Sequence, residues 1–202
     1  MDTSKTLLEK VKRDPKSEAW FELVRLYEPL ITGWIVRAGI DQSEVGDISQ
    51  EVFQTMLREL DAFEHNGRTG AFRNWLKITT INRCRRFWES KKRRAGLLGA
   101  NDGTEVLNQL ADSNSELSKT WDNEHDHYVI ERILKLVEQE FDPKSFEVFV
   151  RNAVKGESAE LLASEYEIPV GQVYKIKFRV MKRLRQEADD LVNIPGYFNK
   201  NR

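Results

Sequence analysis

The sequence predicts an all-α fold, made of two small helical domains joined by a flexible linker, with a helix-turn-helix in the second domain. Apolar residues recur at spacings of three and four along most of the chain, and no convincing period-two strand pattern is present. A run of glycines followed by acidic residues separates the helical patterns into two groups. The expected boundaries are 1–95 for the first domain, 96–126 for the linker, 127–192 for the second domain and 193–202 for the tail.

Composition limits the class of protein. The chain has 202 residues, of which 40% are hydrophobic and 32% charged, and its formal net charge is −1. That content is sufficient for hydrophobic cores, but no run approaches the roughly 20 apolar residues that span a bilayer. The N-terminus also lacks the long apolar stretch of a signal peptide. One cysteine, Cys84, excludes an internal disulfide and favours a reducing compartment. We therefore expect a cytoplasmic protein with no membrane insertion.

The first domain is expected to begin with two amphipathic helices. Apolar residues from Trp20 to Trp34 form one stripe, which Pro29 kinks or divides. A second helix begins at Asp47 and carries an apolar side from Ile48 to Leu60. Its opposite side is polar and mildly acidic, and consists of Asp47, Gln50, Glu51 and Gln54.

The third expected helix, which follows a loop at 65–70, is strongly basic. From Lys77 to Arg94 its lysines and arginines are accompanied by a single acid, Glu89, and by aromatic residues. Cations interleaved with aromatics can bind nucleic-acid phosphates and stack on bases. The same pattern also arises when a solvated charged face accompanies a packed aromatic side. Trp75 and Cys84 are interpreted as core residues of this helix.

The linker is expected to be flexible or only partly helical. Its acids outnumber its one lysine, and its charge is opposite to that of the basic helices. We therefore hypothesise that it covers one of those helices transiently. His125 and His127 are separated by one residue, as metal ligands can be, but no partner lies at a suitable spacing. They are interpreted as solvated linker residues, and no metal is expected.

The second domain is expected to contain a helix, a short turn and a helix over residues 158–185. Asp142-Pro143 predicts an N-cap and first helical position upstream, and Ser158 can cap the next helix. In the motif, Leu161, Leu162, Ala163 and Ile168 are expected to pack against Val173, Val180 and Leu184. The last helix carries a run of basic residues with no acid between them. It could read base edges from its N-terminal turn, or it could be the solvated face of an ordinary helical hairpin.

Taken together, the two halves resemble bacterial RNA polymerase sigma factors of the extracytoplasmic-function group. DISQEVFQTML (47–57), followed by FRNWLKITTIN (72–82) and a basic helix end, is similar to the promoter-melting domain. IPVGQVYKIKFRVMKRLR (168–185) is similar to the recognition helix of the sigma C-terminal helix-turn-helix. The short linker leaves no room for a third domain, which is typical of that group.

The resemblance implies a transcription initiation factor that directs core RNA polymerase to promoter DNA and assists promoter opening. It also implies an anti-sigma factor as a partner, and neither a cofactor nor a catalytic residue in this chain. The polymerase-binding residues would be Asp47, Gln50, Glu51 and Gln54. The minus-ten element would be bound by His65, Asn66, Arg68, Asn82, Arg83, Arg85 and Arg86. The minus-thirty-five element would be bound by Gln172, Tyr174, Lys175, Phe178, Arg179 and Lys182.

Some positions depart from the family pattern. Thr79 stands where relatives usually carry an aliphatic residue, and Arg86 where they often carry an acid. Gln172 and Tyr174 replace a common threonine and a common basic residue. These departures affect the promoter sequence that is expected more than the class of protein.

Two other functions are compatible with parts of the pattern. A stand-alone, dimeric helix-turn-helix regulator would bind palindromic DNA without polymerase. A nuclease would need a metal cluster, and the sequence shows no such cluster, no phosphate-binding glycine loop and no paired-acid motif.

Overall fold

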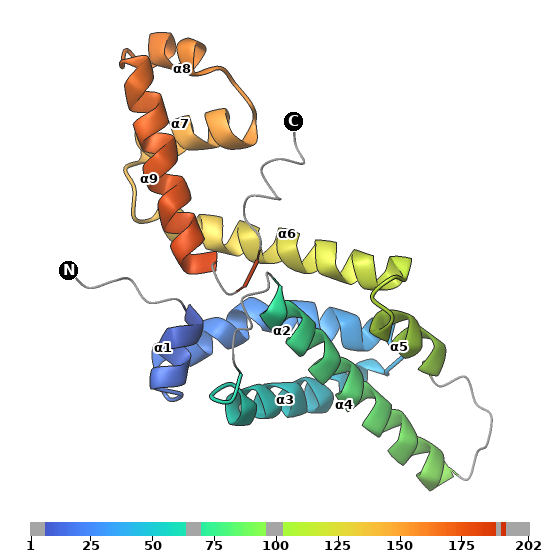
Figure 1. Cartoon of the computed structure of the whole chain (residues 1–202). Helices are drawn as coiled ribbons and strands as arrows, with labels where there is room; N and C mark the ends of the chain where they lie inside the picture. The colour runs from blue at the N-terminus through green and yellow to red at the C-terminus, as the bar shows by residue number, and fades with distance from the viewer. Residues whose placement is uncertain (1–6, 64–69, 96–102, 189–190, 193–202) are drawn as a thin grey trace. The chain divides into compact units, whose positions relative to one another are not determined.

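The computed structural model describes residues 7–63, 70–95, 103–188 and 191–192. These residues form nine α-helices and one π-helix, with no strand among them, which confirms the all-α prediction (Figure 1). The described chain divides into two compact units, and the boundary between them in the sequence lies between His125 and Asp126.

The first unit contains five helices and the beginning of a sixth. They are α1 (Leu7–Arg13), α2 (Glu18–Arg37), α3 (Gln42–Glu59), α4 (Ala71–Ala95), α5 (Thr104–Ala111) and α6 (Glu116–Glu138). The unit boundary lies within α6. In the described part of the chain, no helix is long and apolar enough to span a lipid bilayer.

The core of the first unit is built where α2, α3 and α4 face one another. The stripe predicted for α2 is buried, with Leu23, Tyr27 and Ile31 fully enclosed. α2 is one helix despite Pro29, which lies inside it. Tyr27 packs edge-on against Phe72 of α4, with ring centroids 5.5 Å apart. Cys84 is also buried in α4, as expected, and burial raises the pKa of its thiol to about 12.

The structure of residues 103–125 differs from the expected flexible linker. These residues form α5 and the first half of α6, and Leu107, Leu110 and Trp121 are buried. The indoles of Trp121 and Trp34 pack with centroids 4.4 Å apart. The physical reason is that apolar residues lie at helical spacing beneath the acids and pack against α2 and α4. Residues 96–102 lie outside the described part.

The second unit contains the rest of α6, then α7 (Pro143–Phe149), the π-helix η1 (Val150–Val154), α8 (Ala159–Glu165) and α9 (Val170–Ala188). Both predicted caps are present: the Asp142 carboxylate accepts from Ser145 N at 2.8 Å, and the Ser158 hydroxyl accepts from Leu161 N at 3.1 Å. Hydrogen bonds from the side chain and the backbone N–H of Ser145 lower the pKa of Asp142. α8 and α9 are joined through Glu167, which adopts a φ of 52°.

Packing between α8 and α9 corrects one expectation. Leu162, Ala163, Val173, Val180 and Leu184 are buried, as predicted. Leu161 is 54% exposed instead, because it lies on the outer side of α8 beside the cap.

An ion-pair cluster around Arg151 holds α8 against η1. The Arg151 guanidinium donates to the carboxylates of Glu157 and Glu165, at 2.6 Å and 2.5 Å, and lies over the ring of Tyr166. These hydrogen bonds lower the pKa of both glutamates and raise that of Arg151. One side chain therefore joins the two ends of α8 to the π-helix.

Candidate nucleic-acid and polymerase interface

The polar side of α3 is solvent-exposed, as the sequence predicts. Asp47, Gln50, Glu51 and Gln54 are all exposed and fall at helical spacing on one side. The side chains on the opposite side of α3, including Val52 and Met56, are buried against α2 and α4. The geometry leaves this polar face available to a partner.

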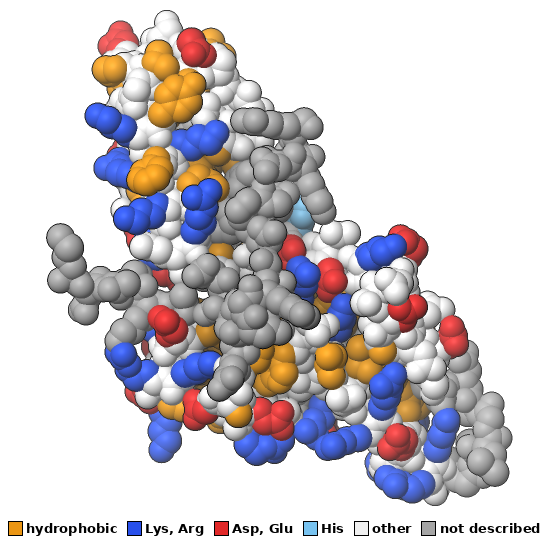
Figure 2. Space-filling model, viewed as in Figure 1, with side chains coloured by type: hydrophobic (Ala, Val, Ile, Leu, Met, Phe, Trp, Pro, Cys, Tyr) orange, Lys and Arg blue, Asp and Glu red, His pale blue; other side chains and the backbone are white. Residues whose placement is uncertain are grey.

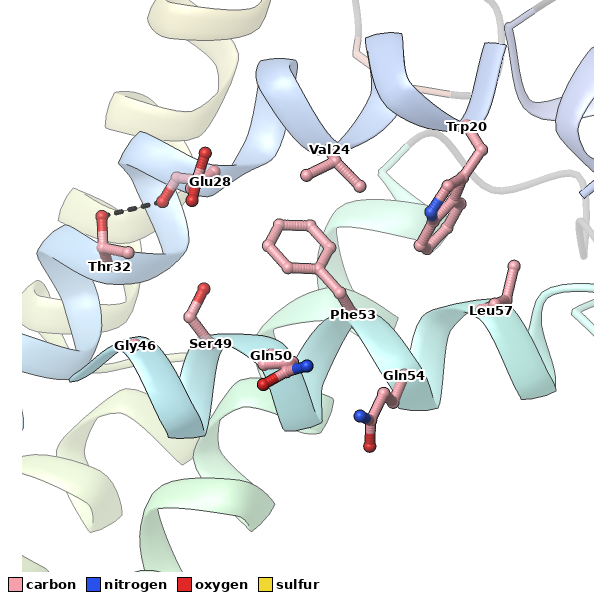
Figure 3. Close-up of a pocket in the computed structure, with 10 residues that line it drawn as sticks. All are labelled: Trp20, Val24, Glu28, Thr32, Gly46, Ser49, Gln50, Phe53, Gln54 and Leu57. Carbon is pink, nitrogen blue, oxygen red and sulfur yellow. Dashed lines mark hydrogen bonds between the residues drawn. The ribbon is translucent and has the colours of Figure 1, made fainter. Parts of the chain in front are cut away.

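A groove between α2 and α3 adjoins that face, and the sequence reading did not identify it. The groove has a volume of about 360 Å³. Figure 3 shows Trp20, Val24 and Phe53 directed into the space between the two helices. Trp20 and Phe53 meet edge-on with centroids 6.4 Å apart. The lining residues are Trp20, Val24, Glu28 and Thr32 of α2 and Gly46, Ser49, Gln50, Phe53, Gln54 and Leu57 of α3.

Gln50 and Gln54 belong both to the polar face and to the groove wall. A partner that contacts the predicted residues would therefore also meet an apolar floor. One residue could have indicated the groove in the sequence. Leu57 is apolar but follows Gln54 by less than one turn, and it is 40% exposed.

The predicted nucleic-acid residues of α4 separate into two groups. Asn82 and Arg86 are exposed one turn apart, next to Ile78, which is 48% exposed. Arg83 and Arg85 instead approach neighbouring helices. A guanidinium nitrogen of Arg83 lies 3.9 Å from the Glu51 carboxylate of α3. Arg85 donates to the Asn108 side chain of α5 at 3.2 Å.

The aromatic and basic end of α4 is anchored to α2 and α3. The Trp88 indole donates to the Ala38 carbonyl at 3.3 Å. Lys91 lies over the rings of Phe87 and Trp88 and 3.2 Å from the Asp41 carboxylate. The aromatics of this end are therefore half-buried supports of the helix. Trp75 is likewise half-buried and packs on Phe63 and Phe72. The predicted residues His65, Asn66 and Arg68 lie outside the described part of the chain.

The outer side of α9 combines exposed aromatic and basic side chains. Tyr174 is 55% exposed and Phe178 66% exposed, and Gln172 is half-buried. Figure 2 shows hydrophobic and basic side chains interleaved over this part of the molecule. Lys175, Arg179 and Lys182 are exposed on the same side. The structure thus brings the six residues predicted for this helix to one surface.

His125 and His127 lie in different surroundings. His125 is fully buried and packs on the ring of Tyr27, with centroids 5.6 Å apart, which corrects its interpretation as a solvated residue. His127 is exposed, as expected. Among the residues described, no group of three or more His, Cys, Asp or Glu side chains could hold a metal ion.

Comparison with known families gives a match for part of the first unit. Residues 23–94 match the family model for Sigma-70 region 2. The matched residues begin in α2 and end in α4, so they include the polar face of α3 and the Asn82 side of α4. Curated proteins gave no match.

The match shows a region similar to Sigma-70 region 2 over residues 23–94, a region found in sigma-70 family sigma factors. It supports a role in transcription initiation with RNA polymerase and implies binding to the core enzyme and to promoter DNA. Members of this family are initiation factors and not enzymes.

Proposed function

We propose that this chain is a sigma factor of the extracytoplasmic-function group, which directs core RNA polymerase to specific promoters and assists their opening. The observation that carries the proposal is the Sigma-70 region 2 match over residues 23–94. The exposed surfaces of α3, α4 and α9 supply the roles that such a factor needs. Bond formation is assigned to the polymerase, so no catalytic residue is assigned to this chain.

Core polymerase is bound by α3 in this proposal. Asp47, Gln50, Glu51 and Gln54 offer carboxylate and amide acceptors along one exposed side. The groove beside them offers aromatic surface from Trp20 and Phe53. A partner helix with an apolar ridge and flanking basic residues would match both features. Burial of the apolar ridge contributes affinity, and the charges select the partner.

The parted strand of the minus-ten element is bound by α4. Asn82 carries both a donor and an acceptor for a base edge, and Arg86 carries a cation for the adjacent phosphate. The loop at 65–70, through His65, Asn66 and Arg68, is assigned the flipped base. Unstacking one base costs a few kcal/mol, and a pocket that accepts the base offsets part of this.

Duplex DNA of the minus-thirty-five element is bound by α8 and α9 as a helix-turn-helix. Gln172, Tyr174 and Lys175 lie in the first turns of α9, where side chains of a recognition helix reach base edges. Phe178 can contact thymine methyl groups, and Arg179 can bind guanine in a bidentate manner. Lys182 follows one turn later and is assigned to a phosphate.

The remaining partners follow from this class. An anti-sigma factor that masks the DNA-binding helices is expected, and the site of action is the cytoplasm. A near-neutral chain, with a formal net charge of −1, would bind DNA weakly by itself. Useful affinity is therefore expected in the presence of polymerase.

Permanganate probing of unpaired thymines tests the proposal. Core polymerase and this chain together should open a defined stretch of a promoter selected from a genomic library, and neither should do so alone. Asn82→Ala should reduce opening while duplex binding in the same mixture persists. Tight binding of palindromic duplex by the chain alone, with no dependence on polymerase, would instead identify a stand-alone regulator.

A further inference from the structure

Three cationic side chains of α4 are paired with side chains from residues 103–125, which we name the cover segment. The Lys77 ammonium lies 3.0 Å from the Asp122 carboxylate and donates to the Ser118 hydroxyl at 2.7 Å. Arg73 lies 3.2 Å from the same carboxylate oxygen of Asp122. Arg85 donates to the side chain of Asn108 at 3.2 Å. The cover segment thus supplies acceptors to a second cationic stripe on α4, formed by Arg73, Lys77 and Arg85.

One member of the second cationic stripe, Arg85, borders the side proposed to bind the parted strand. At 100° per residue, Arg85 lies about 60° around the helix from Asn82. Arg73 and Lys77 follow on the side turned away from Asn82. Lys77 is 5% exposed, whereas Asn82 and Arg86 are exposed. If the cover segment moved away, the cationic surface of α4 would extend from Arg86 round to Arg73.

The contact of the cover segment with α4 combines apolar packing with polar and charged pairs. Its buried apolar residues are Leu107, Leu110 and Trp121, and Trp121 packs on Trp34 of α2. Against α4 it presents a carboxylate, a hydroxyl and an amide. Paired charges that are withdrawn from water give little net stability compared with apolar contacts of the same size. A nucleic-acid phosphate can take the place of Asp122, because it offers the same kind of acceptor.

We propose that the cover segment is an intramolecular competitor for the nucleic-acid strand: it withholds Arg73, Lys77 and Arg85 from DNA until a strand displaces it. This inference rests on the proposed function of α4. While the cover segment is in place, the free chain binds single strands only through the side of α4 that carries Asn82. Displacement frees Arg85 beside that surface and Arg73 and Lys77 further round the helix, and affinity and salt dependence rise together.

Binding of a fluorescent thymidine oligonucleotide to the full chain tests this. Asp122→Asn keeps the size of the side chain and removes the charge that holds Arg73 and Lys77. The matched control is Glu116→Gln, which removes one charge from the same segment where the carboxylate meets only Lys119, at 2.7 Å. Asp122→Asn should raise affinity at low salt about three- to tenfold beyond the control. The salt slope should steepen by about 0.7 for each cation released. Equal affinities and slopes for the two variants would overturn the proposal.

Hydrogen exchange of the unaltered chain gives a second readout, independent of how well a variant folds. Saturation with the oligonucleotide should speed amide exchange at residues 118–125 in the displaced segment. Unchanged or slower exchange there would contradict displacement.

Arg86→Ala distinguishes a failure of the cover-segment proposal from a failure of the strand-binding role proposed for α4. If this change weakens strand binding while Asp122→Asn behaves as its control, the cover is overturned and the assigned role of α4 stands. If Arg86→Ala has no effect in either background, the assigned role of α4 fails, and the inference fails with it.

Discussion

The ammonium nitrogen of Lys77 in α4 lies 3.0 Å from the Asp122 carboxylate in α6. Lys77 is nearly enclosed, whereas the Asp122 side chain is 33% exposed. The pair joins a helix of the matched Sigma-70 region to a segment that follows it in the chain. The stability of the first unit therefore depends on residues outside the family match.

Removal of the two partners should have unequal effects. Asp122→Ala leaves the Lys77 ammonium buried beside Ser118 alone, and we expect a loss of about 2 kcal/mol in the free energy of unfolding. Lys77→Met leaves Asp122 paired with Arg73 and fills the same space, so the change should be within about 1 kcal/mol. Urea unfolding followed by tryptophan fluorescence measures both, because Trp20, Trp34, Trp75, Trp88 and Trp121 all lie in the first unit. A larger loss for Lys77→Met would contradict this account.

A close backbone approach at Gly103 should make that position intolerant of a side chain. Gly103 has a φ of +65°, and an added Cβ would clash with the Ala38 carbonyl and approach Trp88 Nε1 to 3.0 Å. Gly156 has a similar φ of +76° but open space around it, so it isolates the cost of the backbone conformation. Gly156→Ala should cost about 1–2 kcal/mol. Gly103→Ala should cost at least about 1 kcal/mol more. Equal losses in the two units, measured by urea unfolding, would show that α5 does not pack as described.

Acid should loosen the second unit through the Arg151 cluster. Hydrogen bonds from Arg151 lower the pKa of Glu157 and Glu165 below their ordinary value of 4.5. Because the folded pKa lies below the unfolded one, the stabilisation is complete above the unfolded value. It is lost as the pH falls through the folded pKa values. The protection factors of amides in α8 and α9, which correct for the slower intrinsic exchange in acid, should therefore fall below about pH 4.5.

The control for the acid effect is Arg151→Met, which keeps the volume and removes the cation. This variant should be less stable at neutral pH and should lose less stability on acidification. Arg151→Lys should resemble it, because an ammonium cannot form the paired hydrogen bonds that the guanidinium makes with two carboxylates. If Arg151→Met lost as much stability on acidification as the unaltered chain, the Arg151 cluster would not be the cause of the acid effect.

Positive charge introduced on the polar face of α3 should weaken polymerase binding without unfolding the chain. Asp47→Lys combined with Gln54→Lys changes two exposed side chains for which no ion pair is described. Glu51 is spared because it lies 3.9 Å from Arg83 and joins α3 to α4. Affinity for core polymerase should fall at least about tenfold. Glu59→Lys is the matched control and should bind normally, because Glu59 lies more than one turn further along α3 than Gln54 and about 120° around the helix from Asp47. Circular dichroism should show unchanged helix content in all variants.

Helical spacing was a reliable guide where burial is continuous. Leu23, Tyr27 and Ile31 in α2, and Cys84 in α4, were predicted on the apolar side and are buried. The caps Asp142 and Ser158 were also predicted, because an N-cap is a local interaction that the sequence encodes directly.

Long-range pairing could not be predicted in the same way. The acids of residues 96–126 suggested a linker that is flexible or only partly helical, because Asp122 meets Lys77 and Arg73 only after the chain folds. His125 was misread for a similar reason, since its partner Tyr27 is distant in sequence. The sequence alone could not show that Arg83 and Arg85 contact other helices while Asn82 and Arg86 stay exposed. Their partners, Glu51 of α3 and Asn108 of α5, come close only when α3 and α5 pack on α4.

Run-off transcription with core polymerase tests the central claim most directly. A pool of genomic promoter fragments is transcribed with core polymerase alone, with the unaltered chain, and with Asn82→Ala or Arg179→Ala. The account predicts transcripts from defined start positions only when the chain is present. Asn82→Ala should reduce open complexes, and Arg179→Ala should weaken promoter binding by about 1–3 kcal/mol. The absence of any defined start position with folded chain and active core enzyme would contradict the account.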